Sequence, residues 1–233
     1  SGLKVPGDVV GVSGWVNGAG IRQWLTAITN YETPQRNAQM RSYRKSVGLG
    51  VSSKSLGDTM PGPIAVADVD ADGDLDVFVG GRAVTGHYPL ASASSLLINN
   101  SRDLTRAESA LSNALGIVNG AVFSDIDSDG YPELIVATEW GPVRVFKNHE
   151  GNFAEMTDAL GLAGLTGLWQ GVATGDFDGD GMDDIFWQYP EAGANSIWLL
   201  NGAERKSRHS LPNTNVGWRA FGVLDMNGDS FAD

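Results

Sequence analysis

The sequence predicts an all-β fold, a β-propeller of four-stranded blades, on three observations. An acidic loop recurs four times, and the first aspartates of successive loops are separated by 57, 51 and 49 residues. Short apolar runs flank the loops, and 31 glycines among 233 residues indicate many tight turns. Radial repetition of small sheets is typical of propellers, whereas a β-sandwich does not explain a loop that recurs at the same point of each unit.

The N-terminal part of the chain fits this repeat poorly. Residues 1–60 have no acidic loop, although the stretch DVVGVSGWVNG has the character of a strand. We therefore predict a degenerate N-terminal blade or extension over residues 1–60, and propeller blades with calcium loops over residues 61–233.

Between the acidic loops, the predicted strands also recur. The stretches SSLLINN, VRVFKNHEGNF and NSIWLLNGAE each read as a strand followed by a polar turn. Residues 105–117 and 153–165 read as short helical stretches that end in glycine. One repeat is thus four short strands and a connector, and the chain holds about four blades, the last of them incomplete. Either further blades, from the same protein or another chain, complete the ring, or the N-terminal segment supplies the missing strands.

Composition narrows the classes of partner. The net charge is −12, with +4 in residues 1–60 and −16 in residues 61–233, which argues against nucleic acid as the main partner. The chain has no cysteine, so disulfides and thiolate metal sites are excluded. No apolar run is long enough to span a bilayer.

The acidic loops place oxygen ligands at fixed positions. Counting the first aspartate as position 1, acids or an asparagine stand at positions 3, 5 and 9, with glycine at position 6 of the first three loops. Position 7 varies, as expected if it supplies only its backbone carbonyl. The predicted ligands are Asp68, Asp70, Asp72, Asp74 and Asp76; Asp125, Asp127, Asp129, Tyr131 and Glu133; Asp176, Asp178, Asp180, Met182 and Asp184; and Asp225, Asn227, Asp229 and Asp233. The fourth loop departs from the pattern, with Ser230 in place of glycine.

This spacing is the first half of an EF-hand calcium loop. A complete EF-hand also needs a glutamate at position 12 and flanking helices, but position 12 is Val79, Val136 or Trp187, and the flanks resemble strands. We therefore expect a loop between two strands that the position 9 carboxylate closes. Many oxygen ligands in a flexible loop favour Ca²⁺ over Mg²⁺, and the lack of cysteine and nearby histidine disfavours Zn²⁺. A solvated turn is the alternative for any single loop, but recurrence in register favours calcium.

The repeats resemble FG-GAP or VCBS repeats, the integrin-α-type blade whose inter-strand loops bind calcium. The stretches DVDADGDLDVFVGGR, GAVFSDIDSDGYPELIVATEWGPVRVFKN and GDFDGDGMDDIFWQ are similar to bacterial relatives of cartilage acidic protein and of the UnbV proteins. The resemblance covers residues 61–233, without the EGF-like or UnbV-type C-terminal portion. It implies a propeller, commonly of seven blades, whose calcium ions are usually structural.

Two functions are compatible with these features. The first is an extracellular, cell-surface or periplasmic module that calcium stabilises and that binds a protein or a glycan, because millimolar-range calcium sites fill only where calcium is abundant. The tryptophans that could form its binding face are Trp140, Trp169, Trp187, Trp198 and Trp218. Trp187 and Trp198 lie in strand-like runs and are expected in the core, whereas Trp140 and Trp169 lie near loops and are expected to be exposed.

The alternative is a polysaccharide lyase or hydrolase that uses the central face of the propeller. Such an enzyme needs an acid or base, and arginine to hold uronate carboxylates. The candidates are Tyr31, Arg36, Arg41, Tyr43 and Arg44, together with His87, His149 and His209. No spacing pairs these histidines, and a solvated basic face explains the arginines equally well, so binding is favoured over catalysis.

Overall fold

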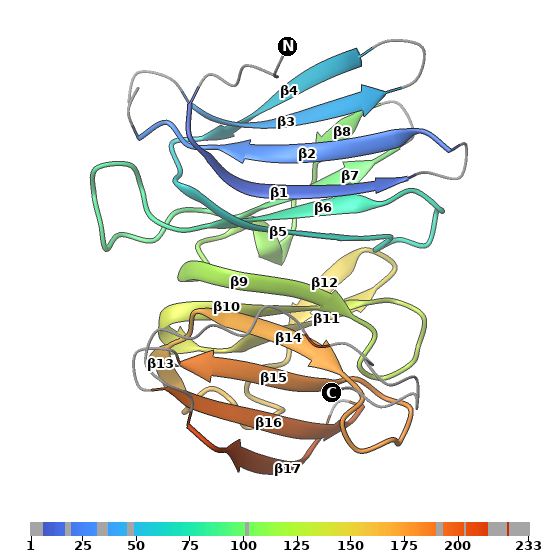
Figure 1. The fold of residues 1–233 in the computed structure, drawn as a ribbon, viewed down its shortest axis with the longest axis vertical. Coiled ribbons are helices and arrows are strands. Elements are labelled where there is room, and N and C mark those ends of the chain that lie inside the picture. Colours follow the sequence, from blue (N-terminus) through green and yellow to red (C-terminus); the bar gives the residue numbers. More distant parts are fainter. Residues whose placement is uncertain are drawn as a thin grey trace. The chain divides into compact units, whose positions relative to one another are not determined.

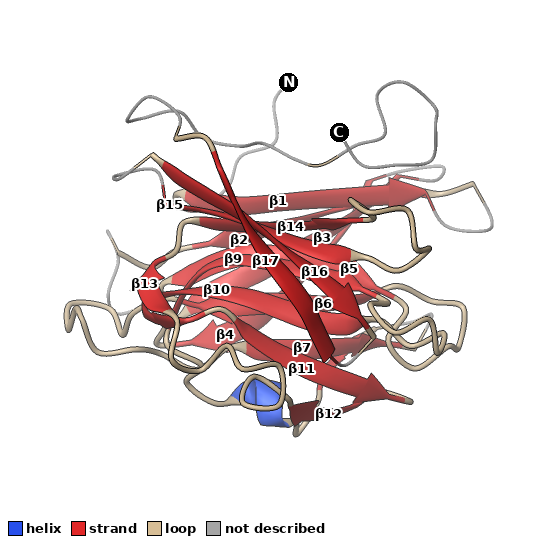
Figure 2. Cartoon of the chain, turned by 90° about the horizontal axis from the view of Figure 1, so that it is seen from below, coloured by secondary structure: helices blue, strands red, loops and turns tan. Residues whose placement is uncertain are grey.

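The computed structural model describes residues 7–16, 20–31, 37–45, 49–100, 103–189, 193–202, 204–213 and 223. Within them the chain is almost entirely β-structure, and its one helical element is the 3₁₀ turn η1 at Ala110–Ser112 (Figure 2). Contacts divide the chain into two compact units, Ser1–Ala67 with Asp72–Val118, and Asp68–Ala71 with Asn119–Asp233.

The first unit contains two four-stranded antiparallel sheets in which the strands follow one another in chain order (Figure 1). The first sheet consists of β1 (Val9–Val16), β2 (Arg22–Ile28), β3 (Ala38–Lys45) and β4 (Leu49–Gly57). The second consists of β5 (Pro61–Ala67), β6 (Asp76–Gly81), β7 (Ser95–Asn99) and β8 (Leu104–Arg106). Residues 1–60 thus include a four-stranded sheet of their own, while the domain boundary at residue 60 stays a prediction.

The second unit repeats this arrangement (Figure 1). Its first sheet is built from β9 (Ile117–Ser124, whose first two residues belong to the first unit), β10 (Glu133–Pro142), β11 (Arg144–His149) and β12 (Asn152–Glu155), with β13 (Thr166–Leu168) paired to the far end of β10. Its second sheet is built from β14 (Gly171–Gly175), β15 (Asp184–Tyr189), β16 (Ala194–Asn201) and β17 (Glu204–Leu211).

These four antiparallel sheets, three of four strands and one of five, confirm the predicted fold class, an all-β protein of blade-like sheets. The number of blades in a closed ring stays a prediction. The two predicted helical stretches were wrong. Residues 105–117 contain η1 as their only helical turn, between the end of β8 and the start of β9, and residues 153–165 form the end of β12 followed by turns. Leucines in both segments are buried in the core although the backbone there is irregular. Their spacing along the sequence therefore resembles the apolar pattern of a helix.

Each unit has its own hydrophobic core. In the first unit, aliphatic side chains of β2, β3, β6 and β7 form a buried cluster that includes Leu25 and Val77. In the second, a group of three tryptophans dominates: the ring centroids of Trp169 and Trp187 lie 4.3 Å apart, and those of Trp187 and Trp198 lie 5.4 Å apart.

The expected burial of Trp187 and Trp198 is confirmed, as is the exposure of Trp140, which is 64% exposed. The expectation for Trp169 was wrong, because this ring is 6% exposed and packs edge-on against Trp187. Trp218 lies outside the described residues.

Truncating Trp198 to alanine should lower the free energy of unfolding by about 3–5 kcal/mol, because the fully buried ring leaves a cavity that its neighbours cannot fill. Urea denaturation measures this change. The matched control is Trp140→Ala, which removes an exposed ring and should cost no more than about 0.5 kcal/mol. Equal losses in the two variants would contradict the assigned core.

Candidate metal sites

Three described acidic loops join the first and second strands of their sheets. We name them loop 1 (Asp68–Asp76, between β5 and β6), loop 2 (Asp125–Glu133, between β9 and β10) and loop 3 (Asp176–Asp184, between β14 and β15). The fourth predicted loop, with Asp225, Asn227, Asp229 and Asp233, lies outside the described residues.

The glycine at position 6 has the conformation that the motif requires. Gly73, Gly130 and Gly181 have φ angles of 89°, 91° and 86°, a left-handed region that other residues rarely adopt. Position 4 is left-handed as well, at Ala71, Ser128 and Gly179. The same turn therefore recurs in all three loops, which explains why their side chains reach equivalent places.

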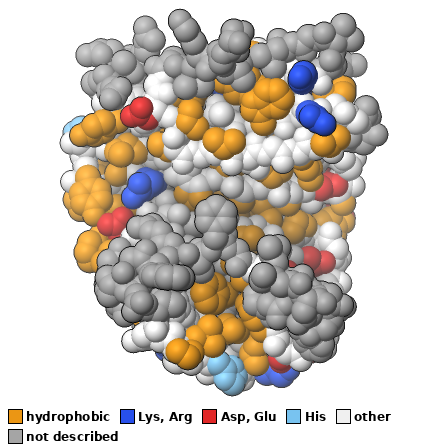
Figure 3. Space-filling view, in the orientation of Figure 1, with side chains coloured by type: hydrophobic (Ala, Val, Ile, Leu, Met, Phe, Trp, Pro, Cys, Tyr) orange, Lys and Arg blue, Asp and Glu red, His pale blue; other side chains and the backbone are white. Residues whose placement is uncertain are grey.

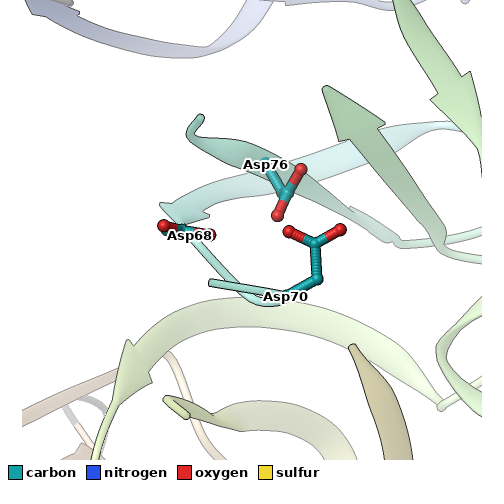
Figure 4. Close-up of side chains that lie close together, drawn as sticks. All are labelled: Asp68, Asp70 and Asp76. Atoms are coloured by element: carbon teal, nitrogen blue, oxygen red, sulfur yellow. The ribbon is translucent and has the colours of Figure 1, made fainter. Parts of the chain in front are cut away.

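The structure brings together the acids at positions 1, 3 and 9. In each loop, one oxygen from each of these three carboxylates lies within 4.8 Å of the others. The three groups are Asp68, Asp70 and Asp76; Asp125, Asp127 and Glu133; and Asp176, Asp178 and Asp184. Figure 4 shows the carboxylates of Asp70 and Asp76 turned toward one another across loop 1.

The acid at position 5 lies outside these groups and stabilises the turn. One oxygen of Asp72, Asp129 and Asp180 accepts a hydrogen bond from the backbone N–H of position 7, at 2.8, 2.9 and 3.0 Å respectively. In loops 2 and 3 the second oxygen faces a lysine ammonium, at 2.6 Å for Asp129 and 3.4 Å for Asp180. The role of position 5 as a metal ligand therefore stays a prediction. The same holds for the backbone carbonyls of Asp74, Tyr131 and Met182.

The carboxylate at position 9 is fully buried in all three loops, at Asp76, Glu133 and Asp184. It accepts backbone N–H groups from the third strand: Asn99 donates to Asp76 at 2.8 Å, and Leu200 donates to Asp184 at 2.8 Å. In loops 2 and 3 it also accepts the N–H of position 2. Position 9 therefore ties the loop to the sheet, a role that the motif alone does not reveal.

Burial makes the carboxylates of Glu133 and Asp184 difficult to ionise. Desolvation raises the pKa of Glu133, although Lys147 opposes the shift, and it raises the pKa of Asp184 against the hydrogen bonds from Leu200 and Phe177. Neighbouring acids raise the pKa of both groups further, Asp127 in loop 2, and Asp178 and Asp180 in loop 3. A nearby positive charge is therefore needed to keep the clusters ionised at low energetic cost.

In loop 2 a lysine supplies such a charge. The Nζ of Lys147, on β11, lies 2.6 Å from an oxygen of Asp127, 2.6 Å from one of Asp129 and 3.1 Å from one of Glu133. Burial alone would lower the pKa of Lys147, but these hydrogen bonds raise it, so the ammonium stays charged. The hydrogen bond from Lys147 also holds the pKa of Asp129 below its usual range.

In loop 3 the lysine comes from a different strand. Lys206, on β17, approaches Asp178 at 2.6 Å and Asp180 at 3.4 Å, and the hydrogen bond to Asp178 raises the pKa of Lys206. The sequence motif could not reveal either lysine, because only strand register brings them to the loops.

The donor set suits a hard divalent cation. All the grouped atoms are carboxylate oxygens, and in loop 3 the buried Oδ1 of Asp178 has no hydrogen-bond partner among the described residues. A buried carboxylate oxygen without a partner is costly, and a cation at this point would satisfy it. The residues present therefore fit a metal ion, which in loop 2 would compete with the Lys147 ammonium for the same oxygens.

The loops also lie against neighbouring hairpins. A Cβ added to Gly202, in the turn after β16, would lie 3.3 Å from the Cβ of Asp127, and one added to Gly151 would lie 3.3 Å from the Cβ of Asp70. Asn148 donates from its side chain to the carbonyl of Val69 in loop 1 at 2.8 Å. In loop 2, position 3 thus packs on a turn of the following sheet within the second unit.

The residues proposed for catalysis do not converge on these clusters. His87 contacts the carbonyl of Thr85, and His209 contacts Ser207, whereas the ring of His149 packs edge-on against Tyr131. None of these histidines belongs to a described acid cluster.

Among the other catalytic candidates, Tyr43 is buried in a stack with Trp24. A role for it in catalysis stays a hypothesis. Arg41 and Arg44 lie on β3, and Tyr31 is exposed in the turn after β2. Arg36 lies outside the described residues.

Comparison with known proteins points to the same repeat. The family profile of the FG-GAP-like repeat matches residues 125–187 and 176–233, and the two matches begin at the first aspartates of loops 2 and 3. FG-GAP-like repeats are therefore present in this part of the chain. No curated protein matches the sequence.

A solved structure supports the fold. The crystal structure of the major Malassezia sympodialis allergen Mala s 1 is similar, with a TM-score of 0.50 and 9% identity, over 95% of this chain and 69% of the allergen chain. At this identity, the similarity extends to the fold alone.

Replacing Lys147 with methionine should separate its role from that of a metal. In EGTA the unfolding free energy of the variant should be about 1–3 kcal/mol lower than that of the wild type, because the carboxylates of loop 2 lose the ammonium that donates hydrogen bonds to them. With millimolar calcium it should recover more stability than the wild type, because the cation no longer competes with the ammonium.

Thermal melting with and without calcium measures both effects. The control is Lys54→Met, which breaks an ion pair with Asp103 away from the loops and should leave the calcium response unchanged. A calcium response in Lys147→Met no larger than that of Lys54→Met would contradict competition at loop 2.

Proposed function

We propose that the chain is a calcium-stabilised, extracellular β-propeller module that binds a protein or a glycan. The observation that carries this proposal is the threefold recurrence of a loop that gathers acids around a fully buried carboxylate. A side-chain arrangement that recurs in three sheets, with the same backbone turn, supports one shared task for the loops.

Calcium is the cation that the loops suit best. Positions 1, 3, 5 and 9 offer carboxylates and position 7 a carbonyl, which is the hard, oxygen-only ligand set that Ca²⁺ prefers in a flexible loop. When bound, the ion would supply charge neutralisation. The residues of the loop connect three strands of the sheet. Position 1 follows the first strand, and position 9 begins the second strand and accepts a hydrogen bond from the third.

Binding is supported over catalysis by the placement of the polar side chains. The described acid clusters are used within the loops, and no described histidine joins them. FG-GAP-like repeats support a propeller-type binding module.

The part of the chain that the structure describes contains no helix long and apolar enough to cross a membrane.

The extracellular location and the wider architecture belong to the same proposal. Low-affinity calcium loops fill where calcium is millimolar, which supports a secreted, surface or periplasmic setting. The motifs support kinship with bacterial relatives of cartilage acidic protein and of the UnbV proteins. They also support a ring of seven blades, which further sheets would complete.

Calcium should raise the melting temperature of the folded protein. At a calcium concentration a hundredfold above Kd, one site adds about 2.7 kcal/mol. For a chain of this size that corresponds to a rise of about 5–10 °C over the value in EGTA. Differential scanning calorimetry measures the shift, and an unchanged midpoint without calcium-binding heat would refute the proposal.

Replacing Asp178 with asparagine should reduce this calcium-dependent rise in melting temperature. The change removes the negative charge of a carboxylate whose Oδ1 is buried without a hydrogen-bond partner among the described residues. The control is Glu108→Gln, which neutralises an exposed acid outside the loops. Identical calcium shifts in Asp178→Asn and the wild type would remove loop 3 from the calcium sites.

A further inference from the structure

A cavity of about 370 Å³ opens in the first unit, away from the acidic clusters. Its walls come from the turn after β2, the segment before β5, the connection between β6 and β7, and the start of β9. Its volume falls within the range of small-ligand sites. Among the residues that the structure describes, no acidic side chain lines it.

Hydrogen bonds fix the segments that form the cavity. The buried side chain of Asn30 donates to Asp58 at 3.4 Å and accepts from Thr85 at 2.6 Å, which joins the turn after β2 to the other two connections. Met60 donates to the carbonyl of Ala83 at 2.8 Å, and Arg82 donates to the carbonyl of Met60 at 2.9 Å. The walls are therefore preformed, which lowers the entropic cost of binding.

Two tyrosines give the cavity an aromatic rim. Tyr31 and Tyr88 are 63% and 60% exposed, and the buried side chains of Ala83 and Ile117 supply an apolar base. On the face drawn in Figure 3, hydrophobic side chains reach the surface with separate Lys and Arg side chains among them. A tyrosine ring offers a flat apolar surface together with a hydroxyl, and the pair of them suits a ligand that is apolar on its faces and polar at its edges.

Arg82 supplies the charge. Its Cγ would lie 2.9 Å from a Cβ added to Gly62, so the glycine makes room for the arginine stem beside the strand. The ion pairs of the described residues involve Lys54, Arg144, Lys147 and Lys206, and Arg82 is not among these. An exposed guanidinium that lines the same cavity as two aromatic rings suits a carboxylate, which it can hold through two parallel hydrogen bonds.

We propose that this cavity binds an acidic sugar residue, a pyranose that carries a carboxylate. Tyr31 and Tyr88 would contact the faces and hydroxyls of the sugar, and Arg82 would bind its carboxylate. The volume admits one or two sugar residues, so the ligand is a terminal or short segment of an acidic glycan. This inference deepens the proposed binding function and rests on it.

Isothermal titration calorimetry of the full chain in millimolar calcium tests the assignment. Tetragalacturonic acid should bind at least about tenfold more tightly than neutral maltotetraose. Added NaCl should weaken the binding of the acidic ligand and leave the affinity for the neutral one unchanged. Arg82→Gln should cost about tenfold in affinity for the acidic ligand, whereas the exposed control Arg22→Gln should not. Tyr88→Ala should weaken binding, and Tyr88→Phe should retain most of it, since the ring remains.

Several outcomes would overturn the assignment. They are equal binding of the acidic and neutral sugars, no effect of Arg82→Gln, and an Arg82-dependent affinity for a tetraglutamate peptide equal to that for the sugar. Salt dependence of the wild type decides the question if Arg82→Gln fails to fold. The calcium-dependent melting shift of the same samples is independent of this cavity, so a failed cavity and a failed module are distinguishable.

Discussion

A fully buried carboxylate at the start of the second strand is the constraint on which each acidic loop depends. Asp76, Glu133 and Asp184 occupy this place, and each accepts a hydrogen bond from the backbone of the third strand. The carboxylate thereby joins three segments of a sheet. Its burial raises the pKa of Glu133 and of Asp184, so the arrangement needs positive charge nearby.

In loops 2 and 3 the protein meets this need with a lysine side chain. Lys147 reaches loop 2 from β11, and Lys206 reaches loop 3 from β17, so neither lysine is a fixed part of the repeat. A lysine ammonium and a divalent ion would neutralise the same oxygens, but only the ion would couple the stability of the protein to the composition of the medium. Since Asp127 packs against the turn at Gly202, neutralising a loop also supports the junction with the next sheet.

The sequence predicted the features that local chemistry determines. The nine-residue spacing identified the loops, the glycine at position 6 fixed their turn, and the carboxylates at positions 1, 3 and 9 meet as expected. The apolar runs around Trp187 and Trp198 correctly indicated core strands.

What the sequence could not predict depends on strand register and tertiary packing. Nothing near Lys147 or Lys206 marks them as partners of acids that precede them by 14 residues or more. The burial of Trp169 follows from its contact with Trp187, which is 18 residues away. The connectors resembled helices because their leucines are spaced as in a helix, although they pack from turns.

The most direct test of the central claim is a crystal structure of the protein grown in calcium, with anomalous diffraction to locate the ion. Calcium at loops 1, 2 and 3, at about 2.3–2.6 Å from the oxygens of positions 1, 3 and 9, is the predicted result. In loop 2, Lys147 should then have left the carboxylates. Loops without anomalous peaks, with Lys147 and Lys206 still bound to their acids, would show that the buried carboxylates are neutralised from within the chain and would contradict the calcium account.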